Sequence, residues 1–431
     1  MYKEHIRVGL LGLGTVGCGT VEIIQKNREE FLKKTGSTIQ ITKALVRNLN
    51  QPRLVKTEGI QLTTNPQSVL EDPDIDIIVE VMGGIGLAKE YIIKALENGK
   101  YVVTANKDLL AQHGESLFEI AKAHKRSIFY EASVGGGIPL IRPFKHCLAA
   151  NRIKSLMGII NGTTNYILTQ MSVAEKEFSE ALAEAQAKGF AEQDPSSDLE
   201  GRDTAYKLAI LSSLAFNSKV DVSQIYTESI TEISSRDIMY AKELGFVIKL
   251  LAVGEETEHG LSLRVHPTLV PIGHPLASVN NEFNALYLTG DAVGEVMFYG
   301  RGAGSLPTGS AIVSDIIDVV RNINNQVENS SMETTFPRKS MVCNEERVSR
   351  FYVRMKANDQ SGVFGSVAMA FGEEQISLDM ILQKRRDFNV AEIVLVTHDV
   401  NEAQFYKALA KIQSLVSIRN LSNVIRVLER G

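Results

Sequence analysis

Residues 6–25 read IRVGLLGLGTVGCGTVEIIQ, an apolar run followed by closely spaced glycines and then by a helical pattern. This order predicts a strand, a tight turn and a helix whose free N-terminal N–H groups attract an anion. Gly12 allows the turn, Gly14 lets the backbone approach a pyrophosphate, and Gly17 lets helix and strand pack closely. An ordinary glycine turn is the alternative, but the position at the start of a strand and helix alternation favours dinucleotide binding. The predicted contacts are Gly12, Leu13, Gly14, Thr15, Val16 and Gly17.

The alternation continues through residues 39–46, 76–82, 87–97 and 101–107. It predicts an α/β fold whose N-terminal part is a Rossmann domain with a parallel sheet. Ligands of such sheets bind beyond the carboxyl ends of the strands, and Thr104 and Lys107 stand at one of these ends. We therefore expect both at the cofactor, although Lys107 alone also fits the plain start of a helix.

Arg47 follows the predicted second strand, where an NAD-specific site usually carries an acidic residue. It lies further from the glycines than the usual ~20 residues, which an enlarged helix and loop at residues 26–38 would explain. With that alignment Arg47 favours a 2′-phosphate, and hence NADP(H) over NAD(H). The alternative is an exposed arginine that merely follows a strand.

The composition indicates a globular protein of two or three domains, since 431 residues are too many for one ordinary core. A net charge of -5 argues against nucleic acid or an anionic membrane as a partner, which leaves small molecules. The three cysteines, Cys18, Cys147 and Cys343, are widely spaced, which is typical of a protein from a reducing compartment. Their spacing does not match that of metal ligands. Because no signal-type or transmembrane apolar block is found, we expect a cytoplasmic protein.

Residues 188–215, KGFAEQDPSSDLEGRDTAYKLAILSSLA, place several acids before an apolar helix that is expected to begin near Asp198. Asp203 and Lys207 are four residues apart and share one helix face. A lone pair of this kind is more often a solvated surface pair. Here Glu192 and Asp198 lie close in sequence and the helix turns apolar after Lys207, so the set is suited to hold an ammonium group and move a proton.

Glu131 precedes three glycines in SVGGGIP, residues 133–139. Successive carbonyl oxygens beside one carboxylate suit a weakly held hard cation. The same composition is more often an ordinary turn.

The pattern predicts three domains in sequence. Residues 1–150 form the Rossmann domain, completed by a returning helix at about 301–325, and residues 151–300 form a mixed α+β domain that binds substrate. A polar linker covers 322–347. Residues 348–431 have the order βαββαβ, typical of a ferredoxin-like unit, and are expected to fold apart from the rest.

Six segments in this order resemble homoserine dehydrogenase: GLLGLGTVG, VVTANK, YEASVGGGIP, NGTTNYIL, GFAEQDPSSDLEGRDTAYKLAIL and GRGAGSLPT. The segment NDQSGV at residues 358–363 resembles an ACT domain, and the resemblance covers essentially the whole chain. It implies a monofunctional enzyme with a C-terminal ACT domain that interconverts L-aspartate 4-semialdehyde and L-homoserine with NADP(H) or NAD(H). This reaction belongs to threonine, methionine and isoleucine biosynthesis.

The resemblance assigns roles to residues already named. Lys207 matches the proton donor, Lys107 matches a lysine that contacts cofactor and substrate, and Asp203 belongs to the catalytic and substrate-binding set. Glu192 and Asp198 match further substrate contacts. The sequence does not decide which of Lys207 and Lys107 delivers the proton.

Further roles follow from the same resemblance. A sodium site is implied at Glu131 with the carbonyl oxygens of Val134, Gly136 and Ile138, and Gly302 matches a cofactor contact. Threonine is the expected effector of the ACT domain, and side-by-side pairing of such units implies a homo-oligomer, dimer or tetramer. Ser361 stands where ACT domains commonly carry proline, so the strength of the threonine response stays open.

Two other classes stay open at this point. A different amino-acid-linked oxidoreductase would keep the glycine turn and the tail but has no need of the set from Glu192 to Lys207. A non-catalytic sensor would keep both binding modules without two lysines placed for hydride chemistry.

Overall fold

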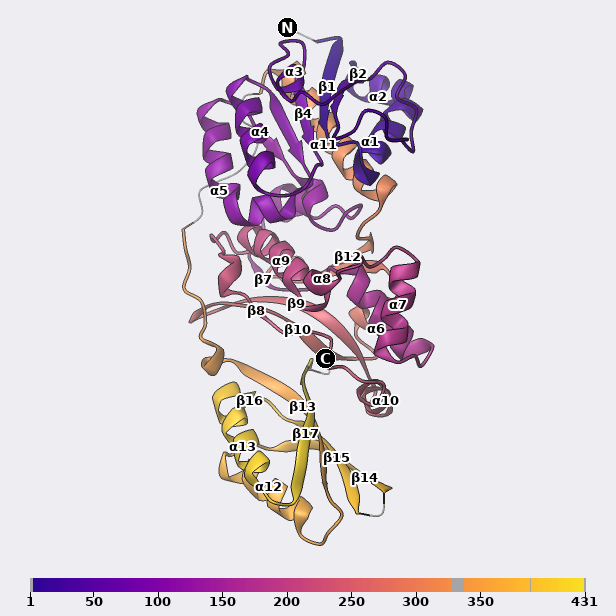
Figure 1. The fold of residues 1–431 in the computed structure, drawn as a ribbon. Helices are drawn as coiled ribbons and strands as arrows, with labels where there is room; N and C mark the ends of the chain where they lie inside the picture. Colours follow the sequence, from indigo (N-terminus) through magenta and orange to yellow (C-terminus); the bar gives the residue numbers. More distant parts are fainter. Residues whose placement is uncertain (1–2, 328–336, 388, 430–431) are drawn as a thin grey trace. The chain divides into compact units, whose positions relative to one another are not determined.

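The computed structural model describes residues 3–327, 337–387 and 389–429 (Figure 1). Contacts within the chain divide it into two compact units. The first contains residues 1–153, 206–223 and 284–338, and the second contains 154–205, 224–283 and 339–431. Among the described residues, no helix combines the length and the apolar character needed to cross a membrane.

The first unit contains a parallel sheet with the order β3-β2-β1-β4-β5-β6. Its strands are β1 (His5–Leu11), β2 (Thr38–Leu45), β3 (Gln61–Thr63), β4 (Ile77–Glu80), β5 (Tyr101–Thr104) and β6 (Ile128–Phe129). The order reverses between β1 and β4, which is the switch point where doubly wound sheets bind nucleotides. The predicted Rossmann sheet is confirmed.

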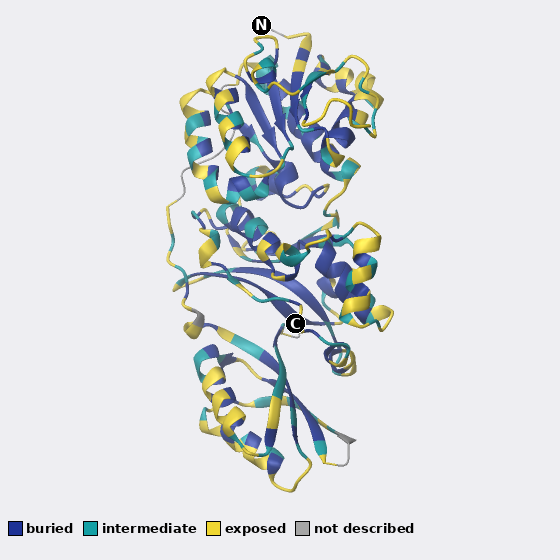
Figure 2. Cartoon of the chain, viewed as in Figure 1, coloured by how far each residue is buried: buried dark blue, intermediate teal, exposed yellow. Residues whose placement is uncertain are grey.

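Helices cover both faces of this sheet, and the buried strands contrast with the exposed outer helix faces in Figure 2. Alternate residues of one strand enter different cores, as Ile77 and Ile78 do. One face packs on α1 (Thr15–Lys26), α2 (Arg28–Thr35) and α11 (Ser305–Asn325). The other packs on α3 (Gln67–Leu70), α4 (Gly86–Glu97) and α5 (Lys107–Ala123).

The returning helix α11 lies beside α1 because two glycines meet there. A Cβ on Gly19 would lie 2.2 Å from the Ser305 carbonyl oxygen, and one on Gly309 would lie 2.8 Å from the Gly19 carbonyl carbon. Strands β11 (Phe283–Gly290) and β12 (Gly294–Arg301) are neighbours that precede this helix. Since α11 reaches Asn325, the first residues of the predicted linker are helical, and residues 328–336 of that linker lie outside the described residues.

The second unit contains the mixed middle region. Its strands are β7 (Ile153–Ile159), β8 (Tyr226–Thr227), β9 (Phe246–Thr257) and β10 (Gly260–Pro271). Its helices are α6 (Gly162–Val173), α7 (Phe178–Ala187), α8 (Ser196–Leu199) and α10 (Ser235–Glu243), while α9 (Arg202–Ala215) passes from the second unit into the first after residue 205. Antiparallel pairing joins β7, β9 and β10.

The prediction that a helix begins near Asp198 and continues past Lys207 is wrong about where that helix begins. Asp198 lies in the short helix α8, and α9 begins only at Arg202. Gly201 separates the two helices with φ +79°, a left-handed conformation that interrupts a right-handed helix. Asp203 and Lys207 nevertheless share α9, as predicted.

The tail has the predicted βαββαβ order. Its elements are β13 (Val348–Asn358), α12 (Val363–Glu373), β14 (Leu378–Asp387), β15 (Val390–Thr397), β16 (Val400–Asn401), α13 (Glu402–Ser414) and β17 (Ile418–Val427). The sheet order is β17-β13-β15-β14, and both helices contribute to the core. Phe351 and Phe405 stack in that core with ring centroids 3.7 Å apart.

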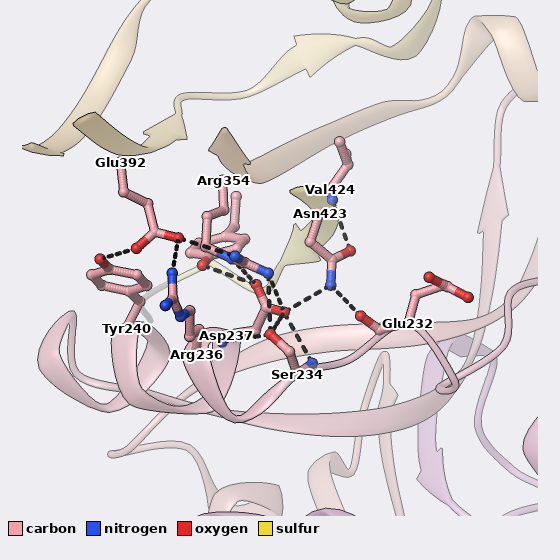
Figure 3. A network of polar contacts seen from close by, with 10 residues as sticks. Glu232, Ser234, Arg236, Asp237, Tyr240, Arg354, Glu392, Asn423 and Val424 are labelled. Atoms are coloured by element: carbon pink, nitrogen blue, oxygen red, sulfur yellow. Dashed lines mark hydrogen bonds and ion pairs between the residues drawn. The ribbon is translucent and has the colours of Figure 1, made fainter. Parts of the chain in front are cut away.

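The tail does not stand apart from the middle region, contrary to expectation. Thr268 and Leu269 of β10 pair in parallel with Arg426 and Val427 of β17, so one sheet continues through both. A buried polar network also joins Asp237 of α10 to the tail sheet (Figure 3). The sequence missed this because the pairing depends on strands far apart in the chain.

Candidate functional site

The glycine turn after β1 has the predicted geometry. Gly12 has φ +103°, and a Cβ on Gly17 would lie 2.4 Å from the Gly12 carbonyl oxygen. A Cβ on Gly14 would meet no atom within 4 Å, so the backbone there faces open space. An added Cβ on Gly17 would also lie 3.4 Å from Leu10 of β1, so helix and strand are close at this position, and α1 begins at Thr15 next to this space.

A cleft of about 680 Å³ opens beside this turn. It is bordered by the glycine turn, the end of β2, the loop at residues 51–54 and the residues after β4. Arg47 is exposed and lines the cleft, as the prediction of a cofactor contact requires. Three other predicted cofactor residues, Thr104, Lys107 and Gly302, do not line this cleft.

Arg53 also lines this cleft, and the sequence analysis did not find it. Its Nη1 donates to the Leu13 carbonyl oxygen at 3.1 Å and its Nη2 donates to the Asn48 carbonyl oxygen at 2.6 Å. These bonds tie the loop after β2 to the glycine turn. No spacing rule points to Arg53, because its place depends on how this loop folds back.

Glu80 organises the carboxyl edge of β4 and β5 and was also missed. One of its oxygens accepts N–H bonds from Met82 (3.0 Å) and Gly83 (3.2 Å), and the other accepts the Thr104 hydroxyl (2.6 Å). Thr104 in turn accepts the N–H of Asn106 at 3.1 Å. Burial raises the pKa of Glu80, while the Thr104 and backbone bonds oppose that rise.

Two predicted cofactor residues therefore differ in their surroundings. Thr104 is fully buried with its hydroxyl bound to Glu80. Lys107 is half-buried at the start of α5, with Nζ 3.8 Å from Asp108. Asn106 caps α5 by accepting the N–H of Leu109 at 3.1 Å, which fixes the start of that helix.

Glu131 is held in a tight cradle after β6. Its carboxylate accepts N–H bonds from Leu140 (2.5 Å), Ile141 (2.8 Å) and Arg142 (2.9 Å). The following turn meets the later glycine segment, since Gly137 donates its N–H to the Arg301 carbonyl oxygen at 3.1 Å. Gly136 lies so close to Gly302 that an added Cβ would be 2.4 Å from the Gly302 carbonyl oxygen.

Asn161 joins two of the predicted substrate acids. Its Nδ2 donates to Asp198 at 2.7 Å and to Asp203 at 2.8 Å, while its Oδ1 caps α6 through the Thr164 N–H at 2.8 Å. A buried amide thus turns two carboxylates toward one point, where they can receive a cation. The sequence analysis includes Asn161 only as the first residue of the segment NGTTNYIL.

Glu192 does not share this arrangement. It is exposed, and its carbonyl oxygen accepts a bond from Gln186 at 3.1 Å. Asp194 on the same loop is occupied by Ser196, whose hydroxyl and N–H lower the pKa of Asp194.

The two candidate lysines lie on neighbouring helices of the first unit. Lys207 is half-buried on α9, one turn beyond Asp203, and Lys107 begins α5. The helices touch where Gln112 of α5 donates to the Tyr206 hydroxyl at 3.2 Å. This hydrogen bond links the two helices that carry Lys107 and Lys207.

Comparison with known proteins decides the family. Models described as "Homoserine dehydrogenase, NAD binding domain", "Homoserine dehydrogenase" and "ACT domain" match residues 12–131, 139–317 and 351–417. A homoserine dehydrogenase of Synechocystis sp. is 46% identical, with 98% of this chain and 99% of that protein covered. The chain belongs to the homoserine dehydrogenase family.

Solved structures of homoserine dehydrogenases share the fold. One from Thiobacillus denitrificans is 40% identical, covers 100% of both chains and has a TM-score of 0.92. A hyperthermophilic archaeal homoserine dehydrogenase in complex with NADPH is 26% identical and has a TM-score of 0.60. It covers 73% of this chain and 97% of its own.

Family membership confirms several predictions. This homoserine dehydrogenase is an NAD(P)-dependent oxidoreductase with a Rossmann domain and a C-terminal ACT domain. It is therefore neither of the two alternative classes. Within the described ranges, no group of three or more His, Cys, Asp or Glu side chains is placed to hold a metal ion.

Glu80 supports the strand edge beside the cofactor cleft, so its replacement should change both stability and cofactor binding. Glu80→Gln replaces one of the two acceptor oxygens that bind two N–H groups and one hydroxyl with an NH2 donor, so we expect the free energy of unfolding to fall by about 1–3 kcal/mol. The dinucleotide Kd should rise as well, because Met82 lines the cleft. Denaturant unfolding and cofactor titration measure the two effects, with the exposed Glu97→Gln as control. An unchanged Kd and stability would contradict this role.

Proposed function

We propose that Asp198 and Asp203 receive the ammonium group of L-aspartate 4-semialdehyde and that Lys207 protonates the oxygen that becomes the hydroxyl of L-homoserine. The observation that supports this best is the pair of bonds from Asn161 to both carboxylates, one helical turn before Lys207. Bound NAD(P)H supplies the hydride. A positioned ammonium group is a competent general acid for the alkoxide formed as the aldehyde carbon accepts that hydride.

The remaining site residues have supporting roles in this proposal. Lys107, at the start of α5, binds cofactor and substrate. Glu192, on its exposed loop, is a further substrate contact. Thr104 acts through Glu80 and Asn106, which shape the strand edge that borders the cofactor. Gly302 is a cofactor contact in this proposal, and its missing Cβ leaves room for the Asn284 side chain, whose nitrogen would lie 2.0 Å from an added Cβ.

We also propose that NADPH is the preferred cofactor. Arg47 lines the cleft beside the glycine turn and is exposed, so its guanidinium group is available for a 2′-phosphate, while Arg53, whose Nη atoms bind Leu13 and Asn48, adds positive charge to the same cleft. The archaeal relative that carries NADPH supports the same choice. A carboxylate at this place would instead favour the ribose hydroxyls of NADH.

Arg47→Ala should separate the two cofactors. Loss of charge-assisted bonds to the 2′-phosphate is expected to weaken NADPH binding by about 1.5–3 kcal/mol and to leave NADH almost unchanged. Cofactor titration with both dinucleotides measures this difference. Equal losses for NADPH and NADH would show that Arg47 does not meet the phosphate.

A sodium ion would be held by Glu131 together with the carbonyl oxygens of Val134, Gly136 and Ile138. The cradle fits such an ion, because three N–H bonds use only part of the acceptor capacity of the buried carboxylate. Its role would be to fix the turn that meets Gly302. We assign it no step in the hydride transfer.

Threonine is proposed as the effector through the ACT domain of a homo-oligomer. Gly362, at the N-terminus of α12, has φ +86°, so this turn is built on a left-handed glycine even though Ser361 replaces the common proline. The test of the whole proposal is NADPH oxidation with L-aspartate 4-semialdehyde, with and without threonine. No turnover would reject the function, and turnover indifferent to threonine would reject only the effector.

A further inference from the structure

The segment from Glu131 to Arg142, which contains the proposed cation turn, is fixed at both ends to one side chain of α11. The N–H of Glu131 donates to Oδ2 of Asp315 at 2.9 Å, and Nη2 of Arg142 donates to Oδ1 of the same carboxylate at 2.6 Å. The segment is also closed on itself, since the N–H of Arg142 donates to the Glu131 carboxylate at 2.9 Å. Asp315 therefore binds the segment where it begins and where it ends.

Asp315 lies on the buried side of α11. Ile312 and Val319 precede and follow it at spacings of three and four residues, which place the three side chains on one helix face. The exposed fraction of Asp315 is 1%. A carboxylate in such a place costs free energy unless hydrogen bonds and a cation satisfy it, so the bonds to Glu131 and Arg142 are needed to keep it there.

Arg142 binds the same turn of α11 at two further points. Its Nη1 donates to the Ser314 hydroxyl, and its Nε lies 3.0 Å from the Asp318 carboxylate. A planar guanidinium group with five donors suits this arrangement, because it can bind several acceptors at once without a change of shape. The end of the segment is thus held by three side chains of one helix.

Helix α11 also connects this segment to the dinucleotide turn. Inside the segment, Gly137 donates its N–H to the Arg301 carbonyl oxygen at 3.1 Å, and a Cβ on Gly137 would lie 2.8 Å from the Cβ of Pro307. Ser305, the first residue of α11, donates its hydroxyl to the Thr15 carbonyl oxygen at 2.8 Å. One helix therefore binds the proposed cation turn near its middle and the dinucleotide turn at its start.

We propose that Asp315 and Arg142 are positioning residues that hold the turn at residues 134–138 in the shape that binds the cation and supports Gly302 beside the cofactor. This inference rests on the proposed function, which places sodium at Glu131 and the cofactor at Gly302. Neither Asp315 nor Arg142 lines the cofactor cleft, so both act through the backbone that they fix. Because α11 joins the two turns, a cation at one is expected to strengthen dinucleotide binding at the other.

Asp315→Asn breaks the pair with little change of shape. The amide oxygen can still accept one bond, but the NH2 group then faces the second donor in place of an acceptor. Burial raises the pKa of Asp315 to about 7, and Arg142 opposes this rise. Measurements at about pH 8.5 therefore compare the amide with a charged wild-type carboxylate.

Fluorescence titration of NADPH with the full chain tests the proposal. The wild-type Kd should be lower in sodium chloride than in choline chloride at equal ionic strength, by about fivefold or more. In sodium chloride, Asp315→Asn should raise the Kd by about fivefold or more and should lose most of the difference between the two salts. Arg142→Gln should do the same, since it removes the other half of the pair.

Two variants serve as controls. Asp318→Asn changes a carboxylate that meets the same guanidinium group but is 30% exposed, so the NADPH Kd should stay within about twofold of wild type. Arg354→Met removes a buried ion pair of the second unit and controls for a loss of stability alone. Its NADPH Kd should equal that of the wild type.

The outcomes separate this inference from the proposed function. A lower free energy of unfolding in Asp315→Asn and Arg142→Gln, with wild-type NADPH Kd values in both salts, would make the pair structural only and overturn the inference. A wild type that does not distinguish the two salts would reject the sodium site, and the Kd in either salt then decides. An increase in Asp315→Asn and Arg142→Gln, but not in the two controls, supports their positioning of Gly302, and no increase rejects it.

Discussion

Lys207→Ala is expected to lower kcat by about 10²-fold or more, the scale of a lost general acid, with the NADPH Kd nearly unchanged. The expectation follows from the position of Lys207 on α9, one turn beyond an acid that Asn161 orients. Steady-state kinetics and cofactor titration measure the two quantities. A variant with wild-type kcat would refute the assignment.

The Lys207→Arg variant distinguishes proton donation by Lys207 from an electrostatic effect of its positive charge. Arginine keeps the positive charge but does not release a proton near neutral pH. If Lys207 is the acid, kcat should fall about as far as in the alanine variant. Recovery of activity in Lys207→Arg would instead assign an electrostatic role, and Lys107 would become the candidate acid. Arg202→Ala, on the same helix but with a solvated charge, is the matched control and should leave kcat close to wild type.

Arg354→Met should destabilise the protein by about 3–5 kcal/mol, because it removes the buried cation that Asp237 and Glu392 share and leaves Glu392 with only the half-exposed Arg236. Arg354 donates to Asp237 at 2.7 and 3.1 Å and to Glu392 at 3.1 Å (Figure 3). Both acids are buried, and Tyr240 and Asn423 complete their bonds. Denaturant unfolding measures the loss.

Arg236→Met is the control for this network. Arg236 also meets Glu392, at 3.4 Å, but its side chain is 47% exposed. An exposed ion pair contributes little, so we expect a loss below about 1 kcal/mol. Equal losses of unfolding free energy in Arg354→Met and Arg236→Met would show that burial of Arg354 and its carboxylates does not add to stability.

The pH dependence of the Arg354 variant has a definite sign. Burial raises the pKa of Asp237, but the bonds from Arg354 outweigh it and the pKa lies below its usual value. The wild-type pair therefore stabilises the fold above the unfolded pKa, and this stability is lost as the pH falls through the folded pKa. Without Arg354, burial is opposed only by weaker contributions such as the bonds from Ser234 and Asn423, so the pKa of Asp237 rises. The difference between wild type and variant should thus be largest at neutral pH and shrink toward acid pH.

Local pattern was sufficient for much of the fold. The glycine turn at Gly12 and Gly17, the parallel sheet and the βαββαβ tail follow from residues close in sequence, since apolar periodicity and glycine conformation act over a few residues. The same approach failed at Gly201. A helix predicted through that position is broken there, because the positive φ of one glycine outweighs the helical pattern around it.

The sequence by itself therefore determined the fold class, the dinucleotide turn, the family motifs and the acid and lysine shared by α9. Only the tertiary structure decided which side chains meet. Asn161 joins Asp198 and Asp203, whereas Glu192 from the same stretch stays exposed. The roles of Glu80 and Arg53 also emerged only there, since burial and pairing depend on segments distant in sequence. The pairing of β17 with β10 could not be predicted for the same reason. The residue pattern of one strand does not specify which distant strand it pairs with.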